Sequence, residues 1–232
     1  MPPPPPRKSP RQQRSRQTVE VVLEAAAHIL EDGGLARFNT NAVAARAGVS
    51  VGSIYQYFPD KDAVMTALIR REAARFDGAL ERALAGAADL PLDDAIGGLI
   101  AVAVRHQTER PNLARILDLE ERRLGLEEQA EAATAAALNR LTAFLETRGV
   151  WEPAVSAADL LNLARGMIDG ALGDDPADLS RRVRRAILGY LAAGPQPSKS
   201  NTTMSSPTFS ALGASVTSRP RLSRWYIARP TS

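Results

Sequence analysis

The pattern of apolar and polar positions along the chain has the period of α-helices. In the segment 16–32, apolar residues recur three and four positions apart, which places them on one face of a helix and predicts that this face is buried. These residues are Val19, Val22, Leu23, Ala26, Ile29 and Leu30. The later segments are rich in Ala, Leu, Arg and Glu, and none alternates as a half-buried strand does. The pattern therefore predicts an all-α protein.

Prolines and glycines divide the predicted helices from one another. Proline interrupts a helix interior but suits the first turn, so the internal prolines are expected to mark helix starts. They are Pro59, Pro91, Pro111, Pro153 and Pro176. Gly33 and Gly34 are expected to end the first helix. The sequence thus predicts about nine helices, near residues 16–32, 40–47, 51–57, 60–86, 91–109, 112–123, 126–148, 154–172 and 177–193.

The run from residue 38 to residue 62 has the layout of a helix-turn-helix. Asn39 or Thr40 can cap the helix at 40–47, and Ser50 can cap the helix at 51–57. Between them, Gly48 allows the chain to turn with a positive φ. This arrangement is typical of proteins that place the second helix in the major groove of DNA.

The second helix of this run has two predicted faces. Ile54 and Phe58 are four residues apart and are expected to point into the protein together. The opposite face would then present residues suited to base edges, since Gln pairs well with adenine and Val can meet a thymine methyl group. These residues are Val51, Gly52, Ser53, Tyr55 and Gln56. Phosphates, which fix such a unit in register, are expected to meet Thr40, Tyr57 and Lys61.

The net positive charge lies at the ends of the chain. Residues 1–16 hold five basic residues and no acidic one, and so do residues 195–232. The first segment is rich in Pro and the second in Ser, Thr and Pro, so disorder is expected over 1–15 and 195–232. The basic N-terminal arm lies beside the predicted DNA-binding helices, and either contact with phosphates or a solvated tail fits its composition.

Several classes of protein are excluded or disfavoured by composition. The sequence has no cysteine, so it forms no disulfide and no thiolate metal site. It has two histidines and none of the common hydrolase, zinc-protease or P-loop motifs, so no catalytic residue, metal or cofactor is expected. No apolar run is long enough to span a membrane, and no signal peptide is evident. A cytoplasmic protein without membrane contact is expected.

Residues 44–62, AARAGVSVGSIYQYFPDKD, resemble the TetR (TetR/AcrR) family of bacterial transcriptional regulators. The resemblance covers about residues 16–70, although the family often has Thr where Asn39 stands. It implies a homodimer in which each subunit has an N-terminal helix-turn-helix domain and a C-terminal domain that binds a small effector and dimerises. The implied DNA-binding domain is 16–62. The helix that begins at about residue 60 joins it to the implied effector-binding and dimerisation domain, 63–194. The implied DNA contacts are Thr40, Ser50, Val51, Gly52, Ser53, Tyr55, Gln56, Tyr57 and Lys61.

The resemblance also assigns roles to the C-terminal half. The helices near 154–172 and 177–193 resemble the pair that forms the family's dimer interface, and each has a broad apolar surface that could also serve the core of one chain. Two interpretations fit polar or soft side chains on mostly apolar helices, which are effector binding and simple exposure to water. The candidates are His106, Asn162, Arg165 and Met167. An apolar or aromatic effector is expected.

Three functions follow for comparison. The first is a ligand-responsive regulator, most often a repressor in this family, released from a palindromic operator on double-stranded DNA by a small effector. The second is a helical protein that coats DNA without reading its sequence. The third, an all-α enzyme, has no supporting motif.

Overall fold

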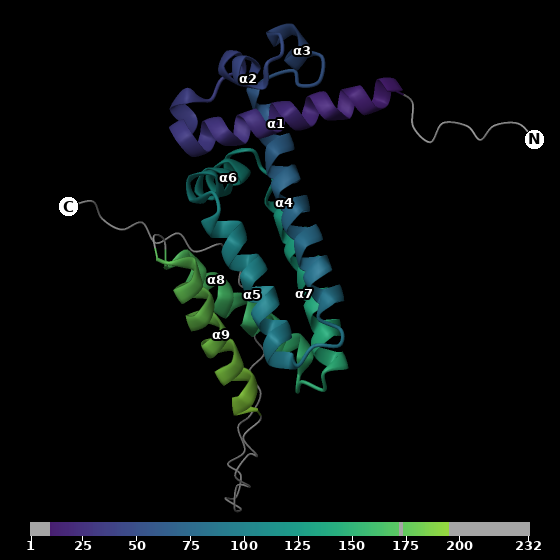
Figure 1. The fold of residues 1–232 in the computed structure, drawn as a ribbon, viewed down its shortest axis with the longest axis vertical. Helices are drawn as coiled ribbons and strands as arrows, with labels where there is room; N and C mark the ends of the chain where they lie inside the picture. The colour runs from purple at the N-terminus through teal and green to yellow at the C-terminus, as the bar shows by residue number, and fades with distance from the viewer. Residues whose placement is uncertain (1–9, 172–173, 195–232) are drawn as a thin grey trace, which may run out of the picture. The chain divides into compact units, whose positions relative to one another are not determined.

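The computed structural model describes residues 10–171 and 174–194, which are helical apart from short connections (Figure 1). Within these ranges no strand occurs, which confirms the all-α prediction. The helices are α1 (Pro10–Arg37), α2 (Thr40–Ala47), α3 (Val51–Tyr55), α4 (Lys61–Gly86), α5 (Leu92–Thr108), α6 (Pro111–Arg123), α7 (Glu127–Thr147), α8 (Pro153–Asp169) and α9 (Pro176–Ala193). The predicted tail, 195–232, lies outside the described residues.

Helix α1 differs from its prediction at both ends. It begins at Pro10, six positions before the expected start at residue 16, while the first nine positions of the expected disordered arm, 1–15, lie outside the described residues. Proline tolerates the first turn of a helix, and the Arg- and Gln-rich residues after it have good helix propensity, so the helix extends beyond its apolar stripe. At the other end Gly34 has φ 65° and ψ −170°, which interrupts the regular helix where the glycine pair was expected to end it.

The helix-turn-helix follows the prediction closely. Asn39 is the N-cap of α2 and Ser50 is the N-cap of α3. Gly48 ends α2 in the left-handed conformation with φ 66°, a value that costs a side-chain-bearing residue about 1–2 kcal/mol. Helix α3 ends at Tyr55 rather than at the expected residue 57, and the backbone N–H of Tyr57 and of Phe58 then bond to the carbonyl of Ile54.

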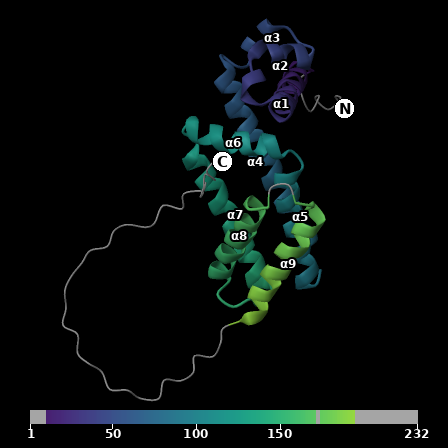
Figure 2. The ribbon, with the colours of Figure 1, turned by 90° about the vertical axis from the view of Figure 1, so that its left-hand side faces the viewer.

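Helix α4 connects the two ends of the described fold. In Figure 1 α1 crosses the top of α4, with α2 and α3 above it, and α5, α7, α8 and α9 lie lower down. Figure 2, seen from the side, shows α8 and α9 next to each other on one flank. The last two helices are therefore far from α3, and α4 runs between the two regions.

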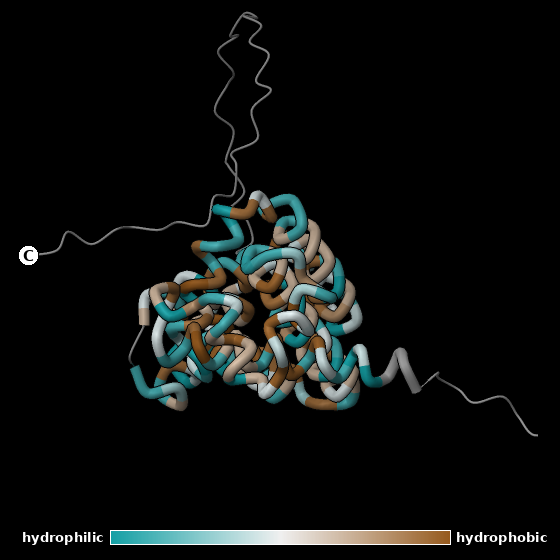
Figure 3. The backbone as a smooth tube through the Cα atoms, turned by 90° about the horizontal axis from the view of Figure 1, so that it is seen from above, coloured by the Kyte–Doolittle hydropathy of each residue, from teal (hydrophilic) through white to brown (hydrophobic). Residues whose placement is uncertain are grey.

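The buried residues form two clusters, and α6 belongs to the first of them. The first cluster contains α1–α4 together with Leu113, Ile116 and Leu117 of α6. The second contains residues of α5, α7, α8 and α9, among them Ile100, Leu145, Leu160 and Val183. The alternation of brown and teal along the helical turns in Figure 3 reflects the division between buried and exposed faces. The apolar stripe of α6 thus packs under α1, although its sequence position is far from the helix-turn-helix.

Candidate nucleic-acid interface

The inner face of α3 is buried as the sequence predicts. Ile54 is 0 % exposed and Phe58 is 6 % exposed, and both pack in the first cluster with Val43 of α2. Because these side chains anchor α3 against α1, α2 and α4, the other side of the helix is held outward. The packing condition on which the DNA-binding interpretation depends is therefore met.

Local hydrogen bonds fix the two short helices. The Asn39 carboxamide oxygen accepts from the Ala42 N–H at 2.9 Å, and the Ser50 hydroxyl accepts from the Ser53 N–H at 3.0 Å. The Gly48 N–H bonds to the Ala44 and Ala45 carbonyls. The Asn39 and Ser50 caps satisfy N–H groups at the helix starts, and the Gly48 N–H satisfies carbonyls at the end of α2, so both helices can remain helical although each is short.

Six of the nine predicted DNA-contacting residues are exposed. They are Ser50, Gly52, Tyr55, Gln56, Tyr57 and Lys61. The other three, Thr40, Val51 and Ser53, are half-buried. Val51 packs against the first apolar cluster, and the Ser53 hydroxyl lies 2.7 Å from that of Ser50, so both residues also have roles inside the protein.

The start of α2 and the end of α3 meet at one point of this surface. The Thr40 hydroxyl lies 3.5 Å from the Tyr55 hydroxyl, although 15 residues separate them. Tyr55 is 53 % exposed and Tyr57 is 37 % exposed. Hydroxyl groups from both helices therefore border the exposed side of α3, where they can donate to or accept from a nucleic acid.

The effector candidates are not brought together. Asn162 and Met167 line an open, mainly apolar hollow of about 520 Å³, together with Asp159, Leu163, Gly166 and Tyr190. Its wall is therefore formed by α8 and α9, the two helices expected to dimerise. Arg165 is not part of this lining. His106 lies on α5, where its ring centroid is 4.8 Å from that of Phe76 on α4.

The contacts that α6 makes with α1 and α4 were missed by sequence reasoning. At the start of α6, the Glu31 carboxylate of α1 accepts from the Leu113 N–H at 2.7 Å. At its end, Arg123 makes two hydrogen bonds of 2.7 and 3.0 Å with Asp62 of α4. The partners are 82 and 61 residues apart, so no local pattern could have shown them. Helix α6 is thus attached at both ends to the region that carries α3.

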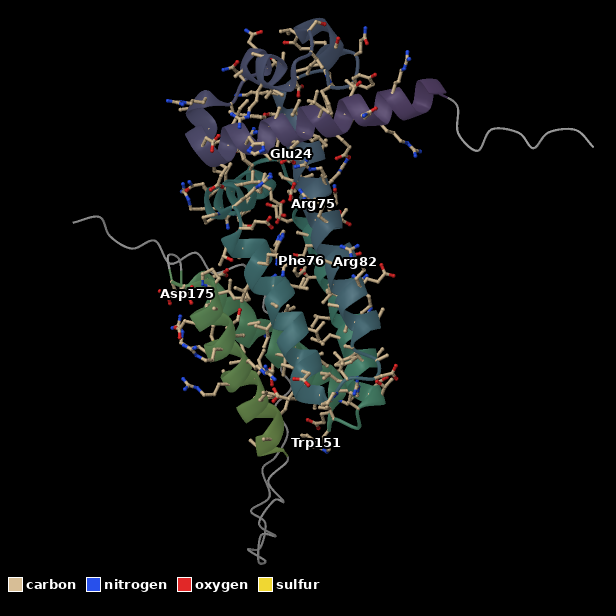
Figure 4. All side chains as sticks on the ribbon, in the orientation of Figure 1. Glu24, Arg75, Phe76, Arg82, Trp151 and Asp175 are labelled. Atoms are coloured by element: carbon tan, nitrogen blue, oxygen red, sulfur yellow. The ribbon has the colours of Figure 1, made fainter. Side chains whose placement is uncertain are left out.

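A group of charges lies at the same junction. Glu24 of α1 accepts from Arg110 at 2.5 Å and lies 3.1 Å from an Arg71 nitrogen of α4 (Figure 4). Burial tends to raise the pKa of Glu24, but the hydrogen bond from Arg110 and the nearby charges outweigh it, and the pKa is lowered. The hydrogen bond from Arg123 likewise lowers the pKa of Asp62. Both carboxylates are therefore ionised at neutral pH.

No helix within the described ranges is both long enough and apolar enough to cross a membrane. Among the same residues, no group of His, Asp and Glu side chains could hold a metal ion.

Comparison with known proteins agrees with this geometry. Residues 22–68 match the family model described as "Bacterial regulatory proteins, tetR family". The chain is 40% identical over 67 residues to the HTH-type transcriptional repressor KstR of Mycobacterium tuberculosis, and the match spans 28% of this chain and 30% of KstR. The sequence likeness to KstR thus covers less than a third of that protein.

Solved structures resemble a larger part of the chain. The fatty acid degradation regulator FadR from Bacillus halodurans superposes with a TM-score of 0.62 at 18% identity, over 79% of this chain and 97% of FadR. SmeT, the repressor of the Stenotrophomonas maltophilia multidrug efflux pump SmeDEF, superposes with a TM-score of 0.54 at 26% identity, over 79% of this chain and 93% of SmeT. A SmeT–triclosan complex superposes with a TM-score of 0.55 at 25% identity, over 84% of this chain and 100% of the SmeT chain. The likeness to FadR concerns the fold alone.

Proposed function

We propose that this chain, whose residues 22–68 match the tetR family of bacterial regulatory proteins, is a dimeric, ligand-responsive repressor that binds a palindromic operator. The observation that carries this proposal is the two-sided character of α3. Ile54 is fully buried, whereas Tyr55 and Gln56 beside it are exposed. A short helix held in this way can enter the major groove with its outer side chains free.

The roles of the outer residues follow from their chemistry. The Gln56 carboxamide is the group suited to adenine, and Ser53 offers a partly sequestered hydroxyl. Gly52 is exposed and has no side chain, so the backbone of α3 can come close to the DNA. Thr40, Tyr57 and Lys61 would bind phosphates, and in the proposal these contacts set the register without reading sequence.

Dimerisation is proposed through α8 and α9. Val155 of α8 is 52 % exposed, and the apolar hollow formed with Tyr190 of α9 is open to solvent in the single chain. Burying such a surface against a second copy would be favourable. Two α3 helices would then meet half-sites about 34–36 Å apart or a multiple of that spacing, so the operator is expected to be palindromic.

The effector is proposed to be small and apolar or aromatic, by analogy with the triclosan bound to SmeT. The His106–Phe76 contact joins α5 to α4, the helix that leads to the DNA-binding region. A ligand bound beside these rings would act on α4 directly. A protein acting on DNA in this way is expected in the bacterial cytoplasm.

The proposal is tested by selecting duplexes from a random-sequence DNA library with the full-length protein. A palindromic consensus is expected, with binding to it much tighter than to unrelated DNA. Gln56→Ala should reduce the preference for the consensus, each lost base contact costing about 1–3 kcal/mol. Recovery of no consensus, with an affinity ratio near one, would instead indicate a DNA-coating protein.

The effector is tested separately. A thermal-shift screen of small apolar and aromatic compounds, triclosan among them, should identify a ligand that also releases the selected duplex. His106→Ala and Met167→Ala then distinguish the two candidate locations, since only the variant at the true site should lose the shift. A ligand that raises the melting temperature but leaves DNA binding unchanged would contradict the regulatory role.

A further inference from the structure

The first turns of α1 carry positive charges that no acidic residue neutralises. Arg14 and Arg16 are exposed and form no ion pair with any residue in the described ranges. The sequence has no acidic residue before Glu20. The apolar stripe of α1 begins only at Val19, and residues 14–18 are not part of the buried cluster. It is an overhang, defined here as residues 10–18, that extends from the folded body.

Elsewhere in the described fold, many arginines pair with acids of other helices. Arg71 lies near Glu24, Arg123 bonds to Asp62, and Arg184 bonds to Asp93 at 2.6 Å. Each of those pairs joins two helices, so both charged side chains have a role inside the protein. Arg14 and Arg16 have no such internal role, so their charge is available to an external anion.

The direction of the overhang indicates which anion it can reach. In Figure 1 the start of α1 projects on the side of α4 opposite to α8 and α9. In Figure 2, which shows the flank with α8 and α9, α1 is viewed nearly along its axis, and this agrees with the direction seen in Figure 1. In a dimer formed through α8 and α9, the overhangs would therefore point away from the two-fold axis. Each would lie beyond the half-site that its own α3 contacts.

We infer that the overhang of α1 binds the phosphate backbone of the duplex just outside each half-site, without reading its sequence. The inference rests on the proposed function, because it requires α3 to hold the duplex. Charge complementarity identifies the partner, since DNA presents closely spaced phosphates and guanidinium groups bind them well. Arg14 and Arg16 are two positions apart and lie on nearly opposite sides of the helix, so the two contribute unequally.

The test compares two lengths of the duplex selected by the wild-type protein. One ends at the outer edges of the half-sites and the other has about ten more base pairs on each side, roughly one helical turn. Binding is measured from 50 to 200 mM salt for the wild type, for Arg14→Ala/Arg16→Ala, and for Arg82→Ala/Arg105→Ala. The last variant is the control, because it also removes two exposed arginines without described ion pairs, but from α4 and α5 (Figure 4 shows Arg82).

On the long duplex, the overhang variant should bind more weakly than the wild type and have a shallower salt dependence. Each lost phosphate contact lowers the slope of log K against log salt by about 0.9, which corresponds to about 3–4-fold in affinity across this range. With up to two contacts per subunit, the slope falls by at most about 3.6 for the dimer. On the short duplex the wild type and the overhang variant should have the same affinity and the same salt dependence. The control variant should match the wild type on both duplexes.

The outcomes separate this inference from the proposed function. An overhang variant that matches the wild type on the long duplex overturns the inference and leaves the repressor proposal intact. Equal losses on both duplexes overturn it too, because the contact would then lie within the half-sites. If the wild type selects no duplex, both ideas fail together. Unchanged melting temperatures are the folding control, since the two side chains are exposed and unpaired.

Discussion

The helix-turn-helix and the α8–α9 surface differ in how their function is encoded. In the first, all nine expected contacts lie between Thr40 and Lys61 and are positioned by caps, a glycine turn and one buried face. In the second, the exposed surface is formed by two helices, and its proposed role depends on a second molecule. The comparison shows that a function carried by local geometry can be inferred from one short segment, whereas a function carried by tertiary surface cannot.

The largest effect is expected from the anchor of α3. Ile54→Ala removes a side chain that is 0 % exposed and should lower the free energy of unfolding by about 2–5 kcal/mol. Operator binding should fall with it, because α3 would lose the contact that orients its outer face. Thermal unfolding followed by far-UV circular dichroism, together with binding to the selected duplex, measures both effects.

Tyr57→Ala is the matched change on the outer side of the same segment. Since Tyr57 is 37 % exposed and Ile54 is 0 % exposed, the loss of Tyr57 should lower stability less than Ile54→Ala does while weakening DNA binding. Equal destabilisation by the two substitutions would contradict the assignment of an inner and an outer face.

The next largest effect is expected at the end of α6. Arg123→Ala removes the partner of Glu120, whose side chain is 8% exposed, and leaves that carboxylate buried without its cation. A loss of about 1–3 kcal/mol is expected. Asp62→Asn leaves the Arg123–Glu120 pair in place and should cost less than about 1 kcal/mol, because both Asp62 and Arg123 are partly exposed. Chemical denaturation of both variants measures the difference, and a larger loss in Asp62→Asn would contradict this reading.

The Asp62–Arg123 pair also predicts how stability depends on pH. The pKa of Asp62 is lower in the folded protein than in the unfolded chain, where it is about 3.9. The stability that the pair contributes is therefore complete above that value and is lost as pH falls through the folded pKa. Denaturation from pH 7 to pH 2 should show a constant gap between wild type and Asp62→Asn near neutrality that narrows below about pH 4. A gap that widens on acidification would show the opposite sign.

The success and failure of sequence reasoning follow the same division. The caps at Asn39 and Ser50 and the turn at Gly48 were predictable because each depends on residues within four positions. The packing of α6 under α1 was not, because the bonds of Glu31 and Asp62 join residues far apart in the chain. Helix propensity alone could have extended α1 to Pro10, but the apolar stripe that was used begins only at Val19.

The candidate effector-binding residues do not form one site, for a related reason. Asn162 and Met167 line one hollow, His106 lies on another helix, and Arg165 does not line that hollow. A binding site is assembled from several helices, and a residue's type on one helix does not reveal its neighbours. The boundaries proposed between the DNA-binding and effector regions, near residues 62 and 63, stay a prediction, although α6 shares its core with the first region.

Two glycines of the helix-turn-helix should respond differently to substitution. Gly48→Ala places a side chain at φ 66° and should cost about 1–2 kcal/mol in stability. Gly52 is in α3, and a Cβ there would meet nothing closer than the Ser50 hydroxyl at 3.8 Å. Gly52→Ala should therefore leave stability unchanged or raise it by up to about 1 kcal/mol.

The DNA-binding assay separates these glycines further. Gly52→Ala should weaken operator binding despite its unchanged stability, because the added methyl group lies on the face proposed to approach the duplex. Melting temperatures and affinities for the selected duplex are the two measurements. A Gly52→Ala variant that binds as tightly as the wild type would show that the backbone of α3 does not come close to the DNA.

The last effect is expected on the α8–α9 surface. The Tyr190 hydroxyl donates to the Asp159 carboxylate at 2.6 Å, and this hydrogen bond raises the pKa of Tyr190. Tyr190→Phe keeps the ring and removes one bond that joins α9 to α8 within the wall of the hollow, so a loss of about 0.5–1.5 kcal/mol is expected. If a second copy covers this surface, the change should also raise the dissociation constant of the dimer in analytical ultracentrifugation. Operator binding at low protein concentration should then weaken while the preferred sequence stays the same, because Tyr190 is far from α3. A variant that changes the preferred sequence would contradict the separation of the two regions, and one that lowers monomer stability without any effect on assembly would contradict the proposed dimer interface.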